Sequence, residues 1–152
     1  VAVEDWIERP KHSVRAADEL ITAVYVPVVE GPQQFAKIGT RNAMVISVAS
    51  FAISIDVGRH HVGTGIGSAG PTVNRATAAE QYLQESLNSS GQWSAPRELE
   101  QDIAMQFGDL VATAARPIDD VRGTAAYRRH AVSVMARRTL NWAWKEYVSA
   151  CS

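Results

Sequence analysis

The feature that most constrains the fold is a change in the spacing of apolar residues near residue 70. Before this point the chain has strand-like segments at residues 19–27, 35–41, 43–56 and 60–67. After it, apolar residues recur at every third or fourth position, as in amphipathic helices. No strand-like segment follows the first of these helices. The sequence therefore predicts an α+β fold, with an antiparallel sheet of three to four strands covered by three helices.

The strand segments differ in how their apolar residues are arranged. Segment 19–27 is apolar on both faces, so we expect a strand covered on both sides. Segment 43–56 alternates, and a turn with Gly58 joins it to segment 60–67, which predicts an antiparallel hairpin. Its apolar face continues one residue past that segment and comprises Ala49, Phe51, Ile53, Ile55 and Val57.

Three helices are predicted in the second half of the chain. Thr77-Ala78-Ala79-Glu80 matches a capping box, and the first helix then buries Ala76, Ala79, Leu83 and Leu87. The second helix has an apolar stripe of Ile103, Phe107, Leu110, Val111 and Ala114. The last helix, at about residues 124–147, carries Tyr127, Ala131, Val134, Met135 and Trp142 on one side.

The composition narrows the classes of function. A chain of 152 residues suits one domain, and a net charge of −1 gives no global basic field for nucleic acid or for an anionic membrane. No apolar run approaches the roughly 20 residues that span a bilayer. Cys151 is the only cysteine, which excludes an intramolecular disulfide and fits a reducing compartment. We therefore expect a cytoplasmic protein.

Residues 63–70, GTGIGSAG, spell the glycine pattern G-x-G-x-x-G from Gly65 to Gly70. In a dinucleotide-binding fold this pattern opens a helix within a βαβ unit, and that unit is missing here. In a strand, Gly63, Gly65 and Gly67 would share one face, and such a face admits close approach of a backbone, a helix or a ligand. We favour the strand interpretation, which leaves open what approaches.

The remaining polar residues form no self-contained active site. His60 and His61 would point to opposite faces of a strand, so one metal cannot easily bind both. The Asp119-Asp120 pair favours helix caps and ion pairs over catalysis. Paired arginines along the last helix (Arg128, Arg129, Arg137 and Arg138) favour a solvated or partner-facing side. We predict neither a catalytic residue nor a metal site in this chain.

Three segments resemble one protein family in their order and spacing. They are FAKIGTRNAMVISVASFAIS, GIGSAGPTVNRATAAEQYL and ARPIDDVRGTAAYRRHAVSVMARRTL, with the motifs F-x-K-x-x-x-R and D-D-x-R-G-x-x-x-Y-R. They resemble the C-terminal domain of the FAD-binding (medium) subunit of molybdenum hydroxylases, the family of carbon monoxide and xanthine dehydrogenases. The resemblance implies that residues 1–18 are the tail of a preceding flavin domain and that residues 19–150 form the C-terminal domain.

The resemblance also implies a role within a larger oxidoreductase. FAD would be held mainly by the upstream domain, and the molybdenum cofactor and 2Fe-2S clusters would lie on partner subunits, the molybdopterin and iron–sulfur subunits. Val45 and Ile46 would be apolar contacts near the flavin, and Lys37 and Arg41 match basic positions of the family. Relatives often carry an Asp at the position of Met44 or Val45, which this chain lacks.

Two functions from different classes remain open at this point. By resemblance, the chain is a catalytically silent, C-terminal part of an electron-transfer subunit, with no nucleic-acid or membrane partner. The alternative is a stand-alone α+β module that binds a partner protein and no flavin.

Overall fold

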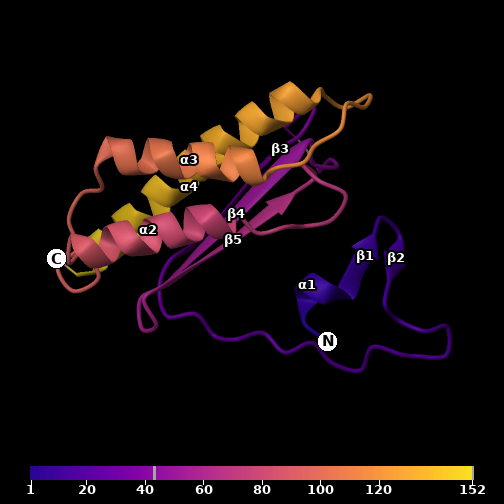
Figure 1. Cartoon of the computed structure of the whole chain (residues 1–152), viewed down its shortest axis with the longest axis horizontal. Coiled ribbons are helices and arrows are strands. Elements are labelled where there is room, and N and C mark those ends of the chain that lie inside the picture. Colours follow the sequence, from indigo (N-terminus) through magenta and orange to yellow (C-terminus); the bar gives the residue numbers. More distant parts are fainter. Residues whose placement is uncertain (43, 152) are drawn as a thin grey trace.

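The computed structural model describes residues 1–42 and 44–151 and contains one main sheet. Its antiparallel strands are β3 (Gln33–Ile38), β4 (Ala49–Asp56) and β5 (His61–Gly67), in the order β3-β4-β5. Helices α2 (Thr77–Ser89), α3 (Gln101–Ala114) and α4 (Ala125–Ala150) all lie on one face of this sheet (Figure 1). The predicted α+β class, with an antiparallel sheet and three covering helices, is confirmed.

The N-terminal segment lies to one side of the main sheet in Figure 1 and meets the rest of the domain through an ion pair between Glu4 and Arg75 at 3.9 Å. It forms a short helix α1 (Val3–Trp6) and a small hairpin of β1 (Ile7–Arg9) and β2 (His12–Ser13). The strand predicted at residues 19–27 is wrong: this segment has no regular structure, and its Leu20 and Tyr25 are 85% and 93% exposed. A strand needs a neighbour for its backbone hydrogen bonds, and no part of the described chain pairs with this segment.

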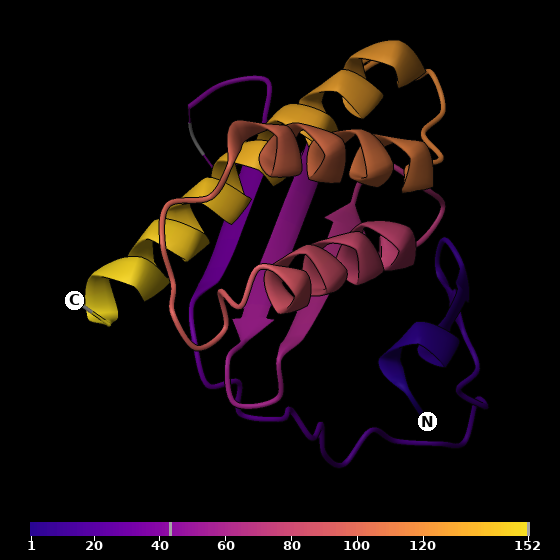
Figure 2. The same cartoon turned by 60° about the vertical axis from the view of Figure 1, so that its left-hand side comes forward.

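The core lies between the sheet and the helices (Figure 2). Ala49, Phe51, Ile53 and Ile55 of β4 are buried toward the helices, as the alternation predicted. The ring of Phe51 meets that of Phe107 edge to face at 6.2 Å, which joins the sheet to α3. The strand predicted to start at Ala43 begins at Ala49, and Ala43 itself lies outside the described residues.

The predicted capping box at the start of α2 is wrong. The N-cap is Ala76, which has no side chain that can cap. Thr64 of β5 replaces it, because its hydroxyl oxygen accepts a hydrogen bond from the Ala76 N–H at 2.9 Å. Glu80 is buried and turns toward β5 instead of the helix terminus. The cap therefore comes from the neighbouring strand, which a local motif could not indicate.

The packing side of α4 was also predicted incorrectly at two positions. Tyr127 and Trp142 are 47% and 51% exposed, whereas Trp144 is 2% exposed. The indole N–H of Trp144 donates to the carbonyl oxygen of Arg97 at 2.7 Å, and its ring lies edge-on to Trp93 and Tyr147. A partner for the polar end of the indole decided which tryptophan is buried.

Candidate functional site

No described helix covers the second face of the sheet, opposite α2, α3 and α4. Each of the three strands contributes alternate residues to it. Phe35 of β3 lies opposite Ala52 of β4, which lies opposite Gly65 of β5; one step along, Lys37 is followed by Ser50 and Gly67. We call this surface the open face. Its residues are Gln33, Phe35, Lys37, Ser50, Ala52, Ser54, Gly63, Gly65 and Gly67.

Most residues of the open face are small, so side chains cover little of its backbone. A side chain at Gly63 would start 2.8 Å from the hydroxyl oxygen of Ser54, and one at Gly67 would meet the hydroxyl of Ser50. These serine hydroxyls have no hydrogen-bond partner within residues 1–42 and 44–151. The strand interpretation of the three glycines is confirmed, because Gly63 to Gly67 pair with β4 throughout. Another surface can approach this backbone closely.

The same strand has no free amides with which to hold a phosphate. The three N–H groups on the outer edge of β5 are all used: Val62 donates to Gln84 Oε1, Thr64 to Glu80 Oε1 and Ile66 to the carbonyl oxygen of Asn74, each at 2.8 Å. Phosphate loops need several free N–H groups that converge on one point. The strand part of GTGIGSAG, residues 63–67, therefore does not fit a pyrophosphate.

The loop between β3 and β4 folds back beside the open face. The ammonium of Lys37 donates to the carbonyl oxygen of Val45 at 3.2 Å, and Val48 N–H donates to Ile38 at 2.7 Å. Gly39 is required for this fold, because the side chain of Val45 occupies the space where a residue with a Cβ would extend. Ile46 projects outward and is 72% exposed.

Two of the four predicted site residues are in direct contact, namely Lys37 and Val45. Ile46 lies next to them on the loop, whereas the side chain of Arg41 is exposed and forms no ion pair with any described residue. Sequence reasoning missed Phe35, an aromatic ring that is 63% exposed on the open face. The signal was its spacing of two residues from Lys37, which places both side chains on one face of β3.

The D-D-x-R-G-x-x-x-Y-R motif, residues 119–128, joins the start of α4 to the preceding turn and to the end of β5. Arg128 is buried, ion-paired with Asp120, and donates to the carbonyl oxygen of Ser68 at 2.9 Å. The Arg122 N–H and then the Arg128 guanidinium lower the pKa of Asp120. The turn ends at Gly123, where an added Cβ would lie 3.2 Å from Val48 Cγ1. Arg128 thus joins α4 to this turn, and the prediction of a solvated or partner-facing arginine is wrong at this position.

The described residues form no group of His, Cys, Asp and Glu side chains that could hold a metal ion. His60 lies flat on the ring of Trp93, with centroids 5.0 Å apart. None of the helices in residues 1–42 and 44–151 is long and apolar enough to cross a membrane.

Comparisons with known proteins fit this geometry. The family model of the CO dehydrogenase flavoprotein C-terminal domain matches residues 34–143. No curated protein matches this chain.

Several solved structures share the fold. A Cu,Mo-CO dehydrogenase in its cyanide-inactivated form has 21% identity and a TM-score of 0.76, over 96% of this chain and 49% of that one. Reconstituted CO dehydrogenase from Oligotropha carboxidovorans has 20% identity and a TM-score of 0.79, over the same shares. Quinoline 2-oxidoreductase from Pseudomonas putida 86 has 14% identity and a TM-score of 0.77, over 95% and 47%. This chain spans about half the length of these relatives.

Proposed function

Because this chain belongs to the CO dehydrogenase flavoprotein C-terminal domain family, we propose that it is the C-terminal, non-catalytic part of the FAD-binding electron-transfer subunit of a molybdenum hydroxylase. The family match carries this proposal, since residues 34–143 include all of the main sheet except Gln33, the β3–β4 loop and the Asp120–Arg128 pair. The complete protein would be a cytoplasmic oxidoreductase whose iron–sulfur and molybdopterin subunits are the partners of this one.

In this proposal the open face packs against the preceding flavin domain, to which residues 1–18 would belong. Two features support the assignment. The face is thin at Gly63, Gly65 and Gly67, which suits close backbone contact, and it carries the exposed ring of Phe35 as an apolar anchor. A domain interface of this kind would also cover segment 19–27, whose apolar side chains have no cover in the described chain.

The β3–β4 loop would then lie beside the flavin ring. Val45 and Ile46 would exclude water from one side of the ring, while Lys37 and Arg41 would place positive charge near it. Lys37 has a second task, since its hydrogen bond to the Val45 carbonyl fixes the loop. Bound FAD would supply the electron-carrying chemistry, and its pyrophosphate would be held upstream because β5 has no free amides for it.

Flavin retention tests the proposal. The 152-residue chain is purified and mixed with FAD, and a second preparation contains the uninterrupted reading frame with the region before Val1. After removal of free FAD, we expect visible flavin absorbance in the longer protein alone. Retention of FAD by the short chain, or a longer protein that stays colourless after mixing with FAD, would refute the division of labour.

Substitutions in the longer protein test the placement of the loop. Ile46→Glu puts a charge where we expect the ring, so we expect weaker FAD retention and a shifted flavin absorption spectrum. Met105→Glu on α3 is the matched control, because it places the same charge on a partly exposed apolar residue of the helical layer. Equal FAD retention and unchanged spectra in both variants would exclude Ile46 from the flavin site.

A further inference from the structure

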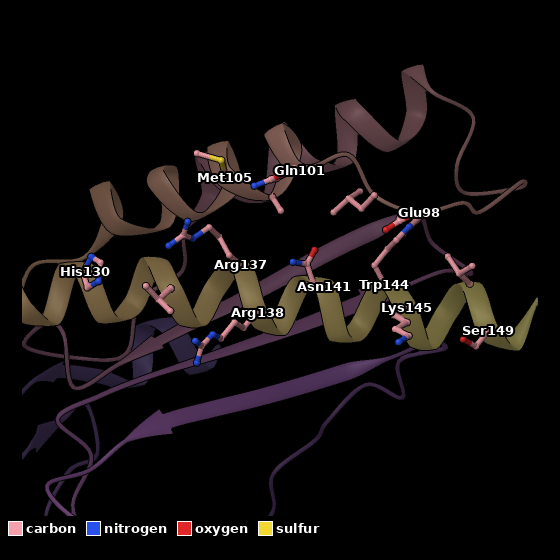
Figure 3. Close-up of a pocket in the computed structure, with 14 residues that line it drawn as sticks. Glu98, Gln101, Met105, His130, Arg137, Arg138, Asn141, Trp144, Lys145 and Ser149 are labelled. Carbon is pink, nitrogen blue, oxygen red and sulfur yellow. The ribbon is translucent and has the colours of Figure 1, made fainter.

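A cleft of about 1040 Å³ lies between α3 and α4 on the helical side of the domain (Figure 3). The helices separate it from the open face, so it would stay accessible if a flavin domain covered that face. Its floor is apolar and includes Leu99, Ala104 and Val134. Met105 adds an apolar side chain that is 44% exposed.

The charges of the cleft are unbalanced. Arg137, Arg138 and Lys145 line it, and Glu98 is its only carboxylate among the described residues. None of the three cations takes part in an ion pair or a hydrogen bond with a described residue. The cleft is therefore positive on a chain whose net charge is −1. Such a local excess favours an anionic ligand.

Arg137 is held in place by the packing of the two helices. Its side chain crosses α3 at Gly108, where an added Cβ would lie 2.6 Å from Arg137 Cγ. The Nε of Arg137 is buried and has no hydrogen-bond partner in the described chain. In Figure 3, Arg137 and Asn141 point from α4 toward α3, while Arg138 and Lys145 are drawn below α4, farther from α3. The three cations therefore line the cleft from α4, and Arg137 is the one held against α3.

We propose that this cleft docks an acidic, amphipathic segment of a partner protein. Carboxylates of the segment would pair with Arg137, Arg138 and Lys145, and an apolar side chain would pack on the floor beside Met105. A single-stranded nucleic acid fits less well, because bases stack best on a large exposed ring, and Trp144, the only Trp, Tyr or Phe among the described residues that line the cleft, is 2% exposed. The surface and its partner are separate from the flavin-facing function proposed above.

A designed peptide pair tests the proposal by fluorescence anisotropy. One short labelled peptide has leucines on one helical face and glutamates on its flanks, and its counterpart replaces every Glu by Gln. We expect the acidic peptide to bind this chain about tenfold more tightly than the counterpart, with an affinity that falls as salt rises. A labelled single-stranded oligothymidylate is the third probe. Equal affinity for the two peptides, no binding of either, or tighter binding of the oligonucleotide would overturn the proposal.

Charge-matched variants locate the binding. The double variant Arg138→Gln/Lys145→Gln changes two exposed residues, so we expect it to fold normally. We expect it to bind the acidic peptide about tenfold more weakly than the unmodified chain. Arg116→Gln/Arg129→Gln removes the same charge from exposed residues outside the cleft and should bind like the unmodified chain. Equal weakening by both pairs would show a nonspecific charge effect and would overturn the assignment.

Discussion

Glu80 is the clearest test of how the sheet is joined to the helices. Its buried carboxylate accepts hydrogen bonds from the Thr64 N–H at 2.8 Å, the Thr64 hydroxyl at 2.7 Å and the Arg75 guanidinium at 2.6 and 3.2 Å. The Glu80 carboxylate of α2 thus accepts hydrogen bonds from β5, and these bonds join the helix to the strand. We predict that Glu80→Ala destabilises the domain more than any change to an exposed carboxylate.

The size of the destabilisation depends on whether each hydrogen-bond donor that loses Glu80 can bind water instead. The Arg75 side chain is 44% exposed, so its guanidinium regains water and its pair with Glu80 contributes little. The Thr64 N–H and hydroxyl would remain inside the β5–α2 contact, at about 1–2 kcal/mol each. Together with the lost packing, we expect Glu80→Ala to lower the free energy of unfolding by about 3 kcal/mol and Tm by about 10 °C. Glu80→Gln keeps one acceptor oxygen, so its cost should be about 1 kcal/mol.

Urea and thermal unfolding, followed by far-ultraviolet circular dichroism, measure these differences. Glu85→Ala is the matched control, because Glu85 is an exposed glutamate on the same helix, and we expect a change of about 0.5 kcal/mol or less. If Glu80→Ala and Glu85→Ala have the same Tm, the shared carboxylate does not join β5 to α2.

Three further predictions follow from single positions. Gln92 is fully buried and neither amide atom has a partner among the described residues, so Gln92→Met should raise the free energy of unfolding by about 1 kcal/mol in urea; a loss of stability would contradict this. The pKa of Asp120 is lowered in the fold, so its contribution to stability is present above the ordinary carboxyl pKa and is lost as pH falls through the lowered value. Stability should therefore fall in acid, and Asp120→Asn should reduce that slope in urea titrations at pH values from neutral to acid; an unchanged slope would argue against it. Gly108→Ala should cost about 1 kcal/mol despite better helix propensity, because the new methyl meets Arg137, and calorimetry that shows a gain would refute this contact.

The sequence predicted the architecture well where periodicity and burial agree. β4 and its core face followed from strict alternation, and α3 from an apolar stripe, because each element has one buried side in this domain. Segment 19–27 failed for the opposite reason: its pattern indicates burial on both sides, and the described chain supplies no surface to bury it. An apolar pattern indicates that a segment becomes buried, but it does not indicate which chain or domain buries it.

The candidate site was only partly accessible to sequence reasoning. Resemblance placed Lys37, Arg41, Val45 and Ile46 on one stretch of chain, but the contact between Lys37 and Val45 depends on a loop that folds back over eight residues. The role of Arg128 needed the tertiary fold as well, since its partner Ser68 is 60 residues away in the sequence. Charge patterns along a helix cannot distinguish a solvated arginine from one that is paired across such a distance.

Helix α4 connects two features of this domain. It has 26 residues, and the 17 residue-to-residue steps from Arg128 to Lys145 correspond to about 26 Å of helical rise. Near the start of the helix the buried Arg128 pairs with Asp120, and the residues that line the positive cleft follow from His130 to Ser149. Helix α4 is continuous over this distance and packs against α3, β3 and β4. The ion pair near its start and the cations that follow it are therefore held at fixed separations on one element.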